Sequence, residues 1–397
     1  MPTSFDKSTH AYSLLFQGDG VWPMAVALLD GGNKVAAADR SGAIYLWDLA
    51  SKPADADEKE KKKDNAASDL APKRRLVGHA NAVTKLIALP DGRTLISASI
   101  DRTIRFWDTQ AEPSGVQESI LDIEDRKQEA RRNKEALDKP GIDVLTISPT
   151  HALEGHQEWI NAMALSRDGK RLITGDDAAH VIVWDIAAKK PIAQWDGRPG
   201  GWVAALALDE HGKQAFVGEY STSRGDFDRP PPEVRVYDVE QAKVKTDILA
   251  IQTPDVKERD NSYGYYSKWS KFVKRGIVCA AFSPDGKTVA LGQGGETDKG
   301  QAHLVEVETG KVIRTISGHQ YGMTDLLFDA EGKHLITAGR DTVVRVTKVA
   351  DGKEVAALGK PRGGQFKDWI TAISLSPDQR TLAGADMGGL VQVWKFG

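Results

Sequence analysis

Residues 74–108 read RRLVGHANAVTKLIALPDGRTLISASIDRTIRFWD. Three runs in this stretch, VTKLIA, TLISAS and IRFW, are rich in β-branched and aromatic residues, with apolar residues at alternating positions. This pattern predicts β-strands. The pair Asp91-Gly92 separates the first two runs and is typical of a tight antiparallel turn. Because the short run RRL precedes them, the stretch predicts a small antiparallel sheet of four strands.

The same pattern recurs along all 397 residues. Each copy starts at an apolar or equivalent position, at Pro23, Val83, Ile160, Val203, Ile277, Met323 and Ile370. A turn residue follows each start at constant spacing, at Gly32, Gly92, Gly169, Gly212, Gly286, Gly332 and Gln379. Without residues 51–72, 109–150, 219–232, 253–275 and 293–301, a copy averages about 41 residues, the length of one propeller blade.

Gly-His and Trp-Asp pairs mark several copies. GH occurs at residues 78–79, 155–156 and 318–319, and WD at residues 47–48, 107–108 and 184–185. At these residues the chain resembles the WD-repeat (WD40-type) β-propeller family. The resemblance implies an all-β, seven-bladed β-propeller of four-stranded antiparallel blades, forming a single domain over residues 10–397. The blade cores are expected at residues 22–49, 83–108, 160–185, 203–238, 277–308, 323–348 and 370–396.

In such a propeller, strands a, b and c of a blade come from one copy and the outer strand d comes from the start of the next. The last copy ends at VQVWKFG, residues 391–397, so its blade lacks strand d. Residues 10–17, HAYSLLFQ, alternate well enough to supply that strand. We predict that this N-terminal strand closes the last blade and the ring, because an open sheet edge is otherwise exposed.

A polar set in the second copy could be mistaken for a hydrolase triad. The resemblance places His79, Ser97, Asp101 and Trp107 at positions that form a buried structural hydrogen-bond network in similar propellers, and we prefer this interpretation. The third copy has Ala178 where the Asp is expected, and the sixth has Thr347 in place of the Trp. The first, fourth, fifth and seventh copies lack the set, so their blades are expected to depend more on packing.

Three insertions have compositions of their own. Residues 51–72 are a charged linker. Residues 109–150 form a helical or irregular insertion, in which residues 116–138 are rich in helix formers and stop before Pro140-Gly141. Residues 253–275 are aromatic and basic, and propeller topology assigns them to the top face, onto which the d-to-a and b-to-c connections open.

The position just before strand a holds a Trp in four of the seven copies. These tryptophans either lie at the top-face opening, where a partner could bind, or pack between neighbouring blades. The b-to-c turns add arginines, and the 253–275 insertion adds further aromatic residues. Since Trp and Arg are enriched at binding hot spots, we predict a partner-binding set of Trp22, Arg40, Trp159, Trp202, Tyr265, Trp269, Arg340 and Trp369.

Composition excludes several classes of protein. The 53 Lys and Arg nearly balance the 56 Asp and Glu, a net charge of -3, which gives no general attraction to nucleic acid or membranes. The single cysteine, Cys279, excludes internal disulfides and thiolate metal clusters. No apolar run is long enough to cross a bilayer, and no signal peptide is evident. We expect a cytoplasmic, monomeric propeller within a possible complex, with no metal and no cofactor.

These features favour a non-catalytic scaffold that binds a protein or peptide on the top face. A lactonase-like propeller hydrolase is one alternative, although the nine histidines show no HxH or HExxH spacing and no GxSxG motif is present. Binding of single-stranded nucleic acid through residues 263–275 is another, because Tyr, Trp and Lys alternate there.

Overall fold

The structure is a computed structural model, and it describes residues 4–15, 22–50, 70–119, 142–220, 232–253, 272, 276–294, 299–359 and 369–397. Tyr265 and Trp269 lie outside these residues, as do nearly all of the predicted 51–72 linker and most of the 253–275 insertion. The chain divides into two compact units. Unit 1 comprises Met1–Glu154 and Phe366–Gly397, and unit 2 comprises Gly155–Gln365.

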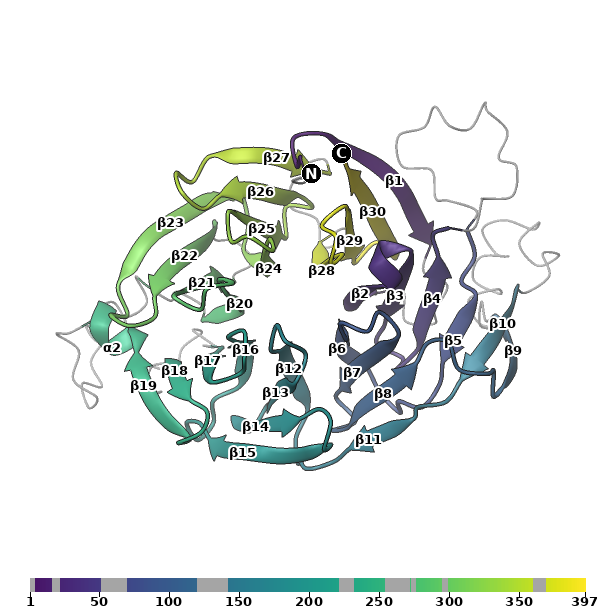
Figure 1. The fold of residues 1–397 in the computed structure, drawn as a ribbon, viewed down its shortest axis with the longest axis horizontal. Helices are drawn as coiled ribbons and strands as arrows, with labels where there is room; N and C mark the ends of the chain where they lie inside the picture. Colours follow the sequence, from purple (N-terminus) through teal and green to yellow (C-terminus); the bar gives the residue numbers. More distant parts are fainter. Residues whose placement is uncertain are drawn as a thin grey trace. The chain divides into compact units, whose positions relative to one another are not determined.

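Unit 1 contains three sheets (Figure 1), whose strand orders are β1-β30-β29-β28, β2-β3-β4-β5-β10-β9 and β11-β8-β7-β6. The first is built from β1 (Ser8–Leu15), β28 (Ile370–Leu375), β29 (Thr381–Asp386) and β30 (Leu390–Phe396). The second is built from β2 (Ala25–Leu29), β3 (Lys34–Ala38), β4 (Ile44–Asp48), β5 (Arg74–Leu76), β9 (Gly115–Ser119) and β10 (Ile142–Ile147), with the short turn η1 (Asp30–Gly32). The third is built from β6 (Val83–Ala88), β7 (Thr94–Ser99), β8 (Ile104–Asp108) and β11 (His151–Leu153).

Unit 2 contains four sheets of four consecutive strands each. The first two are β12 (Ile160–Leu165), β13 (Arg171–Asp176), β14 (His180–Asp185), β15 (Lys190–Asp196), and β16 (Val203–Leu208), β17 (Gln214–Glu219), β18 (Val234–Asp238), β19 (Lys243–Asp247). The other two are β20 (Ile277–Phe282), β21 (Thr288–Gln293), β22 (Gly300–Glu306), β23 (Val312–His319), and β24 (Met323–Phe328), β25 (His334–Gly339), β26 (Val344–Lys348), β27 (Glu354–Leu358). A short helix, α2 (Ile248–Gln252), follows β19.

In each of the seven sheets, four strands in the a-b-c-d order pair antiparallel, which confirms the predicted class, an all-β, seven-bladed β-propeller. Burial explains the strand pattern, because the middle strands are buried on both faces and therefore have apolar or small residues at consecutive positions, as in TLAGAD of β29. The outer strands alternate, as β23 does. Between neighbouring sheets lies the core, for example the cluster that joins Phe216 and Val236 to Leu291 and Val305 in unit 2.

The turn between strands a and b shows why this position favours glycine. Gly92 has φ +68°, and Gln379, the one non-glycine at the aligned position, has φ +62°. This left-handed conformation is the one that glycine adopts without steric cost. The aligned turn residues of the sequence therefore have the same backbone role.

The N-terminal strand closes the last blade, as predicted. β1 pairs antiparallel with β30 from Ser8↔Phe396 to Leu15↔Leu390, two residues earlier in the chain than the predicted 10–17. Figure 1 shows this purple strand beside the yellow β30. Leu14 is fully buried, and the Tyr12 hydroxyl donates to the Leu49 carbonyl at 3.1 Å, which ties the strand to the next blade.

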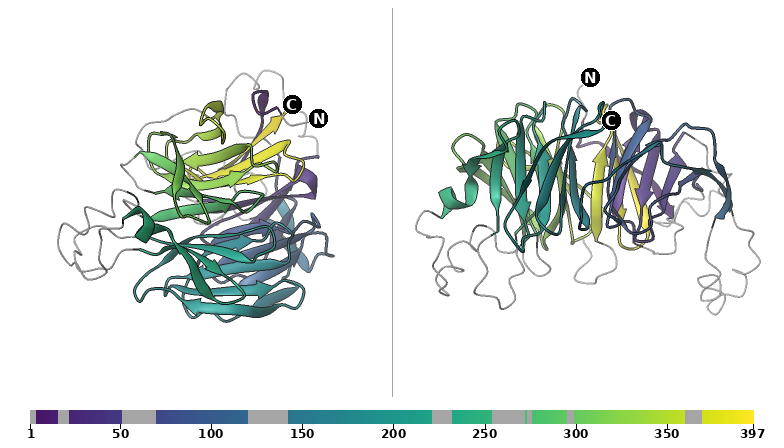
Figure 2. Two further views of the ribbon diagram at one scale, coloured as in Figure 1. Left: turned by 60° about the vertical axis from the view of Figure 1, so that its left-hand side comes forward. Right: turned by 90° about the horizontal axis from the view of Figure 1, so that it is seen from below.

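The 109–150 insertion departs from the expected helix. Val116 lies in β9, which pairs antiparallel with β10, and β10 pairs in parallel with β5. The two strands extend the sheet outward, as Figure 2 shows in its right-hand view. The prediction of a helix was therefore wrong for residues 116–119, and residues 120–138 lie outside the described residues.

Candidate functional site

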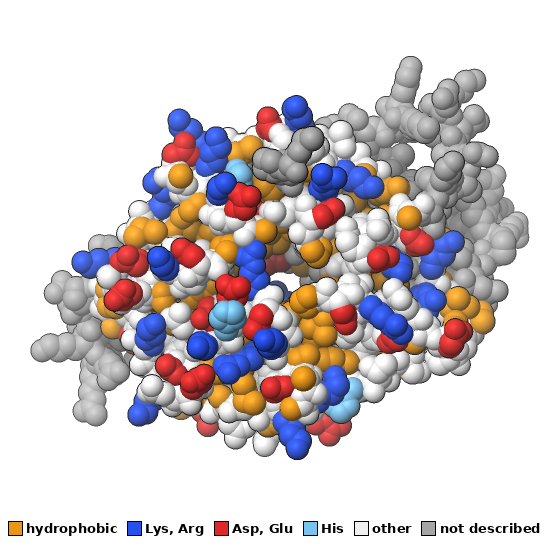
Figure 3. All heavy atoms as spheres, viewed as in Figure 1, with side chains coloured by type: hydrophobic (Ala, Val, Ile, Leu, Met, Phe, Trp, Pro, Cys, Tyr) orange, Lys and Arg blue, Asp and Glu red, His pale blue; other side chains and the backbone are white. Residues whose placement is uncertain are grey.

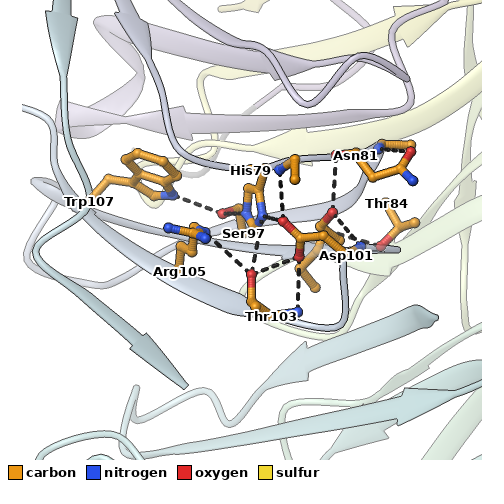
Figure 4. A network of polar contacts seen from close by, with 12 residues as sticks. His79, Asn81, Thr84, Ser97, Asp101, Thr103, Arg105 and Trp107 are labelled. Atoms are coloured by element: carbon orange, nitrogen blue, oxygen red, sulfur yellow. Dashed lines mark hydrogen bonds and ion pairs between the residues drawn. The ribbon is translucent and has the colours of Figure 1, made fainter. Parts of the chain in front are cut away.

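The polar set predicted in the second copy forms one connected network (Figure 4). His79 Nδ1 lies 2.8 Å from Asp101 Oδ2, and His79 Nε2 lies 2.6 Å from Ser97 Oγ. The Trp107 indole N–H donates to the same Ser97 oxygen at 2.8 Å. Burial tends to raise the pKa of Asp101, but hydrogen bonds from His79 and Thr103 outweigh it and hold the pKa well below its usual range.

The order Asp, His, Ser is that of a hydrolase triad, but the environment is that of a structural network. Ser97 is completely buried, and its oxygen already accepts the indole N–H. A nucleophile must reach its substrate, and this hydroxyl does not reach the surface. The network instead joins the loop before strand a to strands b and c.

The third blade completes the same network with a different carboxylate. His156 Nδ1 lies 2.8 Å from Asp176 Oδ2, and its Nε2 lies 2.8 Å from Thr174 Oγ1, which accepts the Trp184 indole N–H. The acid is at the end of strand b, two residues before Ala178, so the expectation of a missing Asp was wrong. In the sixth blade His319 meets Asp341 and Thr337 in the same way.

The fourth blade uses an ion pair in place of the histidine. Glu219 is fully buried at the end of β17, and its carboxylate lies 3.0 Å from the Arg198 guanidinium and accepts the Arg198 and Glu233 backbone N–H groups. Burial is the main cause of the raised pKa of Glu219, and Arg198 opposes it. A Cβ at Gly201 would lie 2.2 Å from Glu219 Oε1, so the loop can approach only because residue 201 is a glycine.

The fifth blade has a neutral version, in which the Gln293 amide donates to the Phe272 carbonyl. Blades four and five thus have an ion pair and a hydrogen bond, respectively, in place of the histidine network. The expectation was that these blades depend more on packing. In five blades, therefore, a side chain at or just after the end of strand b fixes the loop that leads into strand a.

A backbone hydrogen bond places the predicted top-face residues in pairs. In each pair, the residue after strand b donates to the carbonyl of the residue before strand a. The bonds are Ile100 to Ala82, Asp177 to Trp159, Tyr220 to Trp202, Arg340 to Gly322 and Met387 to Trp369, all between 2.9 and 3.1 Å. The side chains of each pair therefore leave the backbone next to each other.

Three of the four predicted tryptophans are exposed rather than packed as core. Trp22 is 41% exposed, Trp159 51% and Trp202 43%, whereas Trp369 is half-buried. Such exposure is unusual for large aromatic side chains. By contrast, Trp47 and Trp107, the residues in strand c, are fully buried. The position before strand a thus presents indole rings to solvent.

The neighbours of these indoles differ between the units. In unit 1 the Arg40 guanidinium lies 4.9 Å from the centre of the Trp22 ring, in a cation–π contact. In unit 2, the Asp177 backbone N–H donates to the Trp159 carbonyl, and Trp202 stacks parallel to Tyr220 with ring centres 6.4 Å apart. Arg340 is half-buried in unit 2 beside Gly322, which has no side chain.

Sequence reasoning missed Glu219 and Tyr220 as parts of this site. Both were assigned to an insertion at residues 219–232, but Glu219 ends strand β17 and Tyr220 bridges to Gly276. The signal that could have found Glu219 is the constant spacing from the start of strand a, which aligns it with Asp39 and Asp176.

The described residues contain neither a metal-binding cluster nor a membrane-spanning helix. In that part of the chain, no group of three or more His, Cys, Asp or Glu side chains is close enough together to hold a metal ion. Nor does that part contain a helix with the length and apolar character needed to span a membrane.

Fold and site together define a seven-bladed β-propeller with exposed indoles at a repeated position. The family model "WD domain, G-beta repeat" matches residues 70–108, 147–185, 310–347 and 360–395. Four segments of the chain match this model and its sheets form seven blades, so the chain contains WD repeats and is similar to the WD-repeat β-propeller family.

Similar proteins include Autophagy-related protein 16 of Arabidopsis thaliana, which is 22% identical over 278 residues, 67% of this chain and 53% of that protein. WD repeat-containing protein 55 homolog of Drosophila virilis is 33% identical over 122 residues, 30% of this chain and 22% of that protein. ASTRA-associated protein 1 of Aspergillus flavus is 40% identical over 53 residues, 13% and 12% of the two chains. The chain thus spans about half or less of the length of these relatives.

Proposed function

We propose that the chain is a non-catalytic scaffold that binds a protein or peptide partner through the top face of its blades. The exposure of Trp22, Trp159 and Trp202 at one repeated position is the main support for this proposal. Exposed indoles that are held by a fixed backbone bury much surface on binding and lose little side-chain freedom. Arg40, Arg340 and Trp369 belong to the same set of positions. The four matched WD repeats and the similarity to WD-repeat proteins fit a role in protein interaction.

A hydrolase is a weaker candidate. The Asp101, His79 and Ser97 arrangement is the one described feature that suggests acyl-transfer chemistry, and its serine is buried and engaged by Trp107. Exposed indoles, together with a serine that is buried in a structural network, favour binding over catalysis.

Single-stranded nucleic acid is also a weaker candidate. On the face drawn in Figure 3, basic and acidic side chains are intermixed over both units. Nucleic-acid binding needs a basic track along the phosphates, and the predicted residues 263–275 lie almost entirely outside the described residues.

The proposal is tested by affinity capture from native lysate. The bait is the wild-type chain or the variants Trp22→Ala, Trp159→Ala and Trp202→Ala. We expect at least one group of co-purifying proteins to be depleted with each variant. Ile313→Ala is the matched control, because Ile313 is an exposed apolar residue on the outer strand β23, away from the top-face positions. Recovery of the same proteins at equal abundance with all three tryptophan variants would refute the top-face assignment.

A further inference from the structure

The chemistry of the partner can be specified for one part of the top face. We propose that Trp159, Asp177 and Trp202 of unit 2 form a surface that binds a Lys or Arg side chain of a protein partner. We call these three residues the indole–carboxylate surface. The inference rests on the proposed function and adds to it the charge of the group that is bound.

Asp177 is bonded to the segment of Trp159, and the turn that contains it touches the loop that leads to Trp202. Its backbone N–H donates to the Trp159 carbonyl at 3.1 Å. The turn that contains it also contacts the next blade, since the Gly197 N–H donates to the Ala179 carbonyl at 2.7 Å, and residue 197 begins the loop that leads to Trp202. A Cβ at Gly175 would lie 2.4 Å from the Val203 side chain, which shows how closely strand b of one blade approaches the start of the next.

The carboxylates of this region have no cation to balance them among the described residues. Asp177 accepts a hydrogen bond from the Asn161 amide, which is neutral. Glu158 is exposed next to Trp159 in the chain. Partial burial, followed by the charges of Asp176 and Glu158, raises the pKa of Asp177. The site therefore stores electrostatic repulsion that a bound cation would relieve.

The indoles favour the same ligand. The face of an indole ring attracts a cation, and the alkyl stem of Lys or Arg packs on exposed aromatic surface. Trp202 is held in one orientation by its parallel stacking on Tyr220. An acidic or phosphorylated partner would be repelled by Asp177 and Glu158. The combination of exposed rings and unbalanced negative charge thus favours a basic side chain.

The experiment selects peptides from a random linear phage library on the immobilised full-length chain. Selected peptides are sorted by whether they still bind the Trp159→Ala variant. We expect the peptides that depend on Trp159 to be enriched in Lys and Arg. For a synthetic peptide of this group, Asp177→Asn is expected to weaken binding roughly tenfold, because a charged hydrogen-bond partner is lost. Replacing the basic residue of the peptide by norleucine should have a similar effect.

Ile313→Ala, on the outer strand β23 and outside the predicted binding set, is the control and should leave the affinity of that peptide unchanged. If the Trp159-dependent peptides show no excess of Lys and Arg, or bind Asp177→Asn as tightly as the wild type, the inference is wrong while the proposed function stands. If no selected peptide depends on Trp159 or Trp202, the inference fails together with the part of the proposed function that concerns unit 2. Equal thermal midpoints of the variants exclude misfolding as the cause of any loss.

Discussion

Trp22 in unit 1 and Trp159 in unit 2 occupy the same position in their blades but have neighbours of opposite charge. Arg40 lies over the ring of Trp22, whereas Asp177 is bonded through its backbone to Trp159. The strands around both positions are built alike. The repeat therefore sets the backbone at this position, and the turn residue beside each indole sets the local charge.

The buried carboxylate at the end of strand b also has different partners in the two units. In unit 2, Glu219 binds Arg198 and two backbone N–H groups. In unit 1, the aligned Asp39 uses Oδ1 for the Ser41 and Ala43 N–H groups, while its buried Oδ2 has no hydrogen-bond partner among the described residues. At this aligned position, both carboxylate oxygens of Glu219 have partners, whereas only one oxygen of Asp39 does in the described part of the chain.

The largest expected effect concerns the closing strand, a device found in unit 1 but absent from the described sheets of unit 2. Deleting residues 1–15 removes β1, together with the buried Leu14 and Phe5, and exposes β30 as an edge. Loss of this apolar burial and of the strand pairing should lower the free energy of unfolding by about 5 kcal/mol. Urea denaturation followed by far-UV circular dichroism measures the change.

If the deleted chain does not fold, Leu14→Ala gives a milder test, with an expected loss of about 3 kcal/mol. Ile313→Ala, on the exposed side of the outer strand β23, should change stability by less than ~0.5 kcal/mol. Equal stability of the Leu14 and Ile313 variants would show that β1 is dispensable.

The two buried carboxylates provide the next comparison. Glu219→Gln breaks the buried pair with Arg198 and should destabilise the chain by about 3 kcal/mol. Asp39→Asn keeps an oxygen for the N–H groups of the turn and should cost about 1 kcal/mol or less. Both changes are measured by chemical denaturation at neutral pH. Equal losses would contradict the different partners of the two residues.

Acid should weaken unit 2 through His303. Burial lowers the pKa of this imidazole from 6.5 to about 4 in the folded chain. Between pH 6.5 and pH 4 the unfolded state binds more protons than the folded state. The stability that comes from the neutral, buried His303 is therefore fully present above pH 6.5 and is lost as the pH falls toward 4. The loss between pH 7 and pH 5 should be about 2 kcal/mol.

The His303→Leu variant isolates this effect from other titrating groups, because it removes the imidazole and keeps the position apolar. Its free energy of unfolding should depend less on pH than that of the wild type over the same interval. Parallel pH profiles for the two proteins would mean that His303 is not buried in its neutral form.

The smallest expected effect concerns the Trp of the histidine network, which the second blade has and the sixth blade lacks. Trp107→Phe removes the indole N–H that reaches Ser97 and should cost about 1 kcal/mol. Thr347 already stands at the aligned position of the sixth blade, so Thr347→Val, which breaks no histidine network, serves as the comparison. Thermal unfolding of both variants measures the difference. A neutral Trp107→Phe would mean that the network contributes little to stability.

The seven repeats could be predicted because their alternating strands and DG turns are local features of the sequence. The closing strand could be predicted because the last copy visibly lacks its outer partner. One feature of the fold could not be predicted. The parallel pairing of β10 with β5 joins segments far apart in the chain, and no local pattern encodes it.

The candidate site could be predicted only in part. The repeated position of the tryptophans could be found in the sequence, but it left open whether the rings are exposed or packed between blades. The carboxylates Asp176 and Glu219 were missed because they end strand b, two residues before the turn position that Asp101 occupies in the second blade. Which side chain satisfies a buried polar group depends on three-dimensional contacts that the repeat pattern leaves open.

Hydroxyl-radical footprinting of the intact protein tests the exposed indoles most directly, with other tryptophans of the same chain as internal standards. We expect Trp22, Trp159 and Trp202 to be oxidised several-fold faster than the buried Trp47, Trp107 and Trp184. Oxidation of the first three at the slow rate of the buried three would show that these rings are packed as core, and would contradict the proposed binding surface.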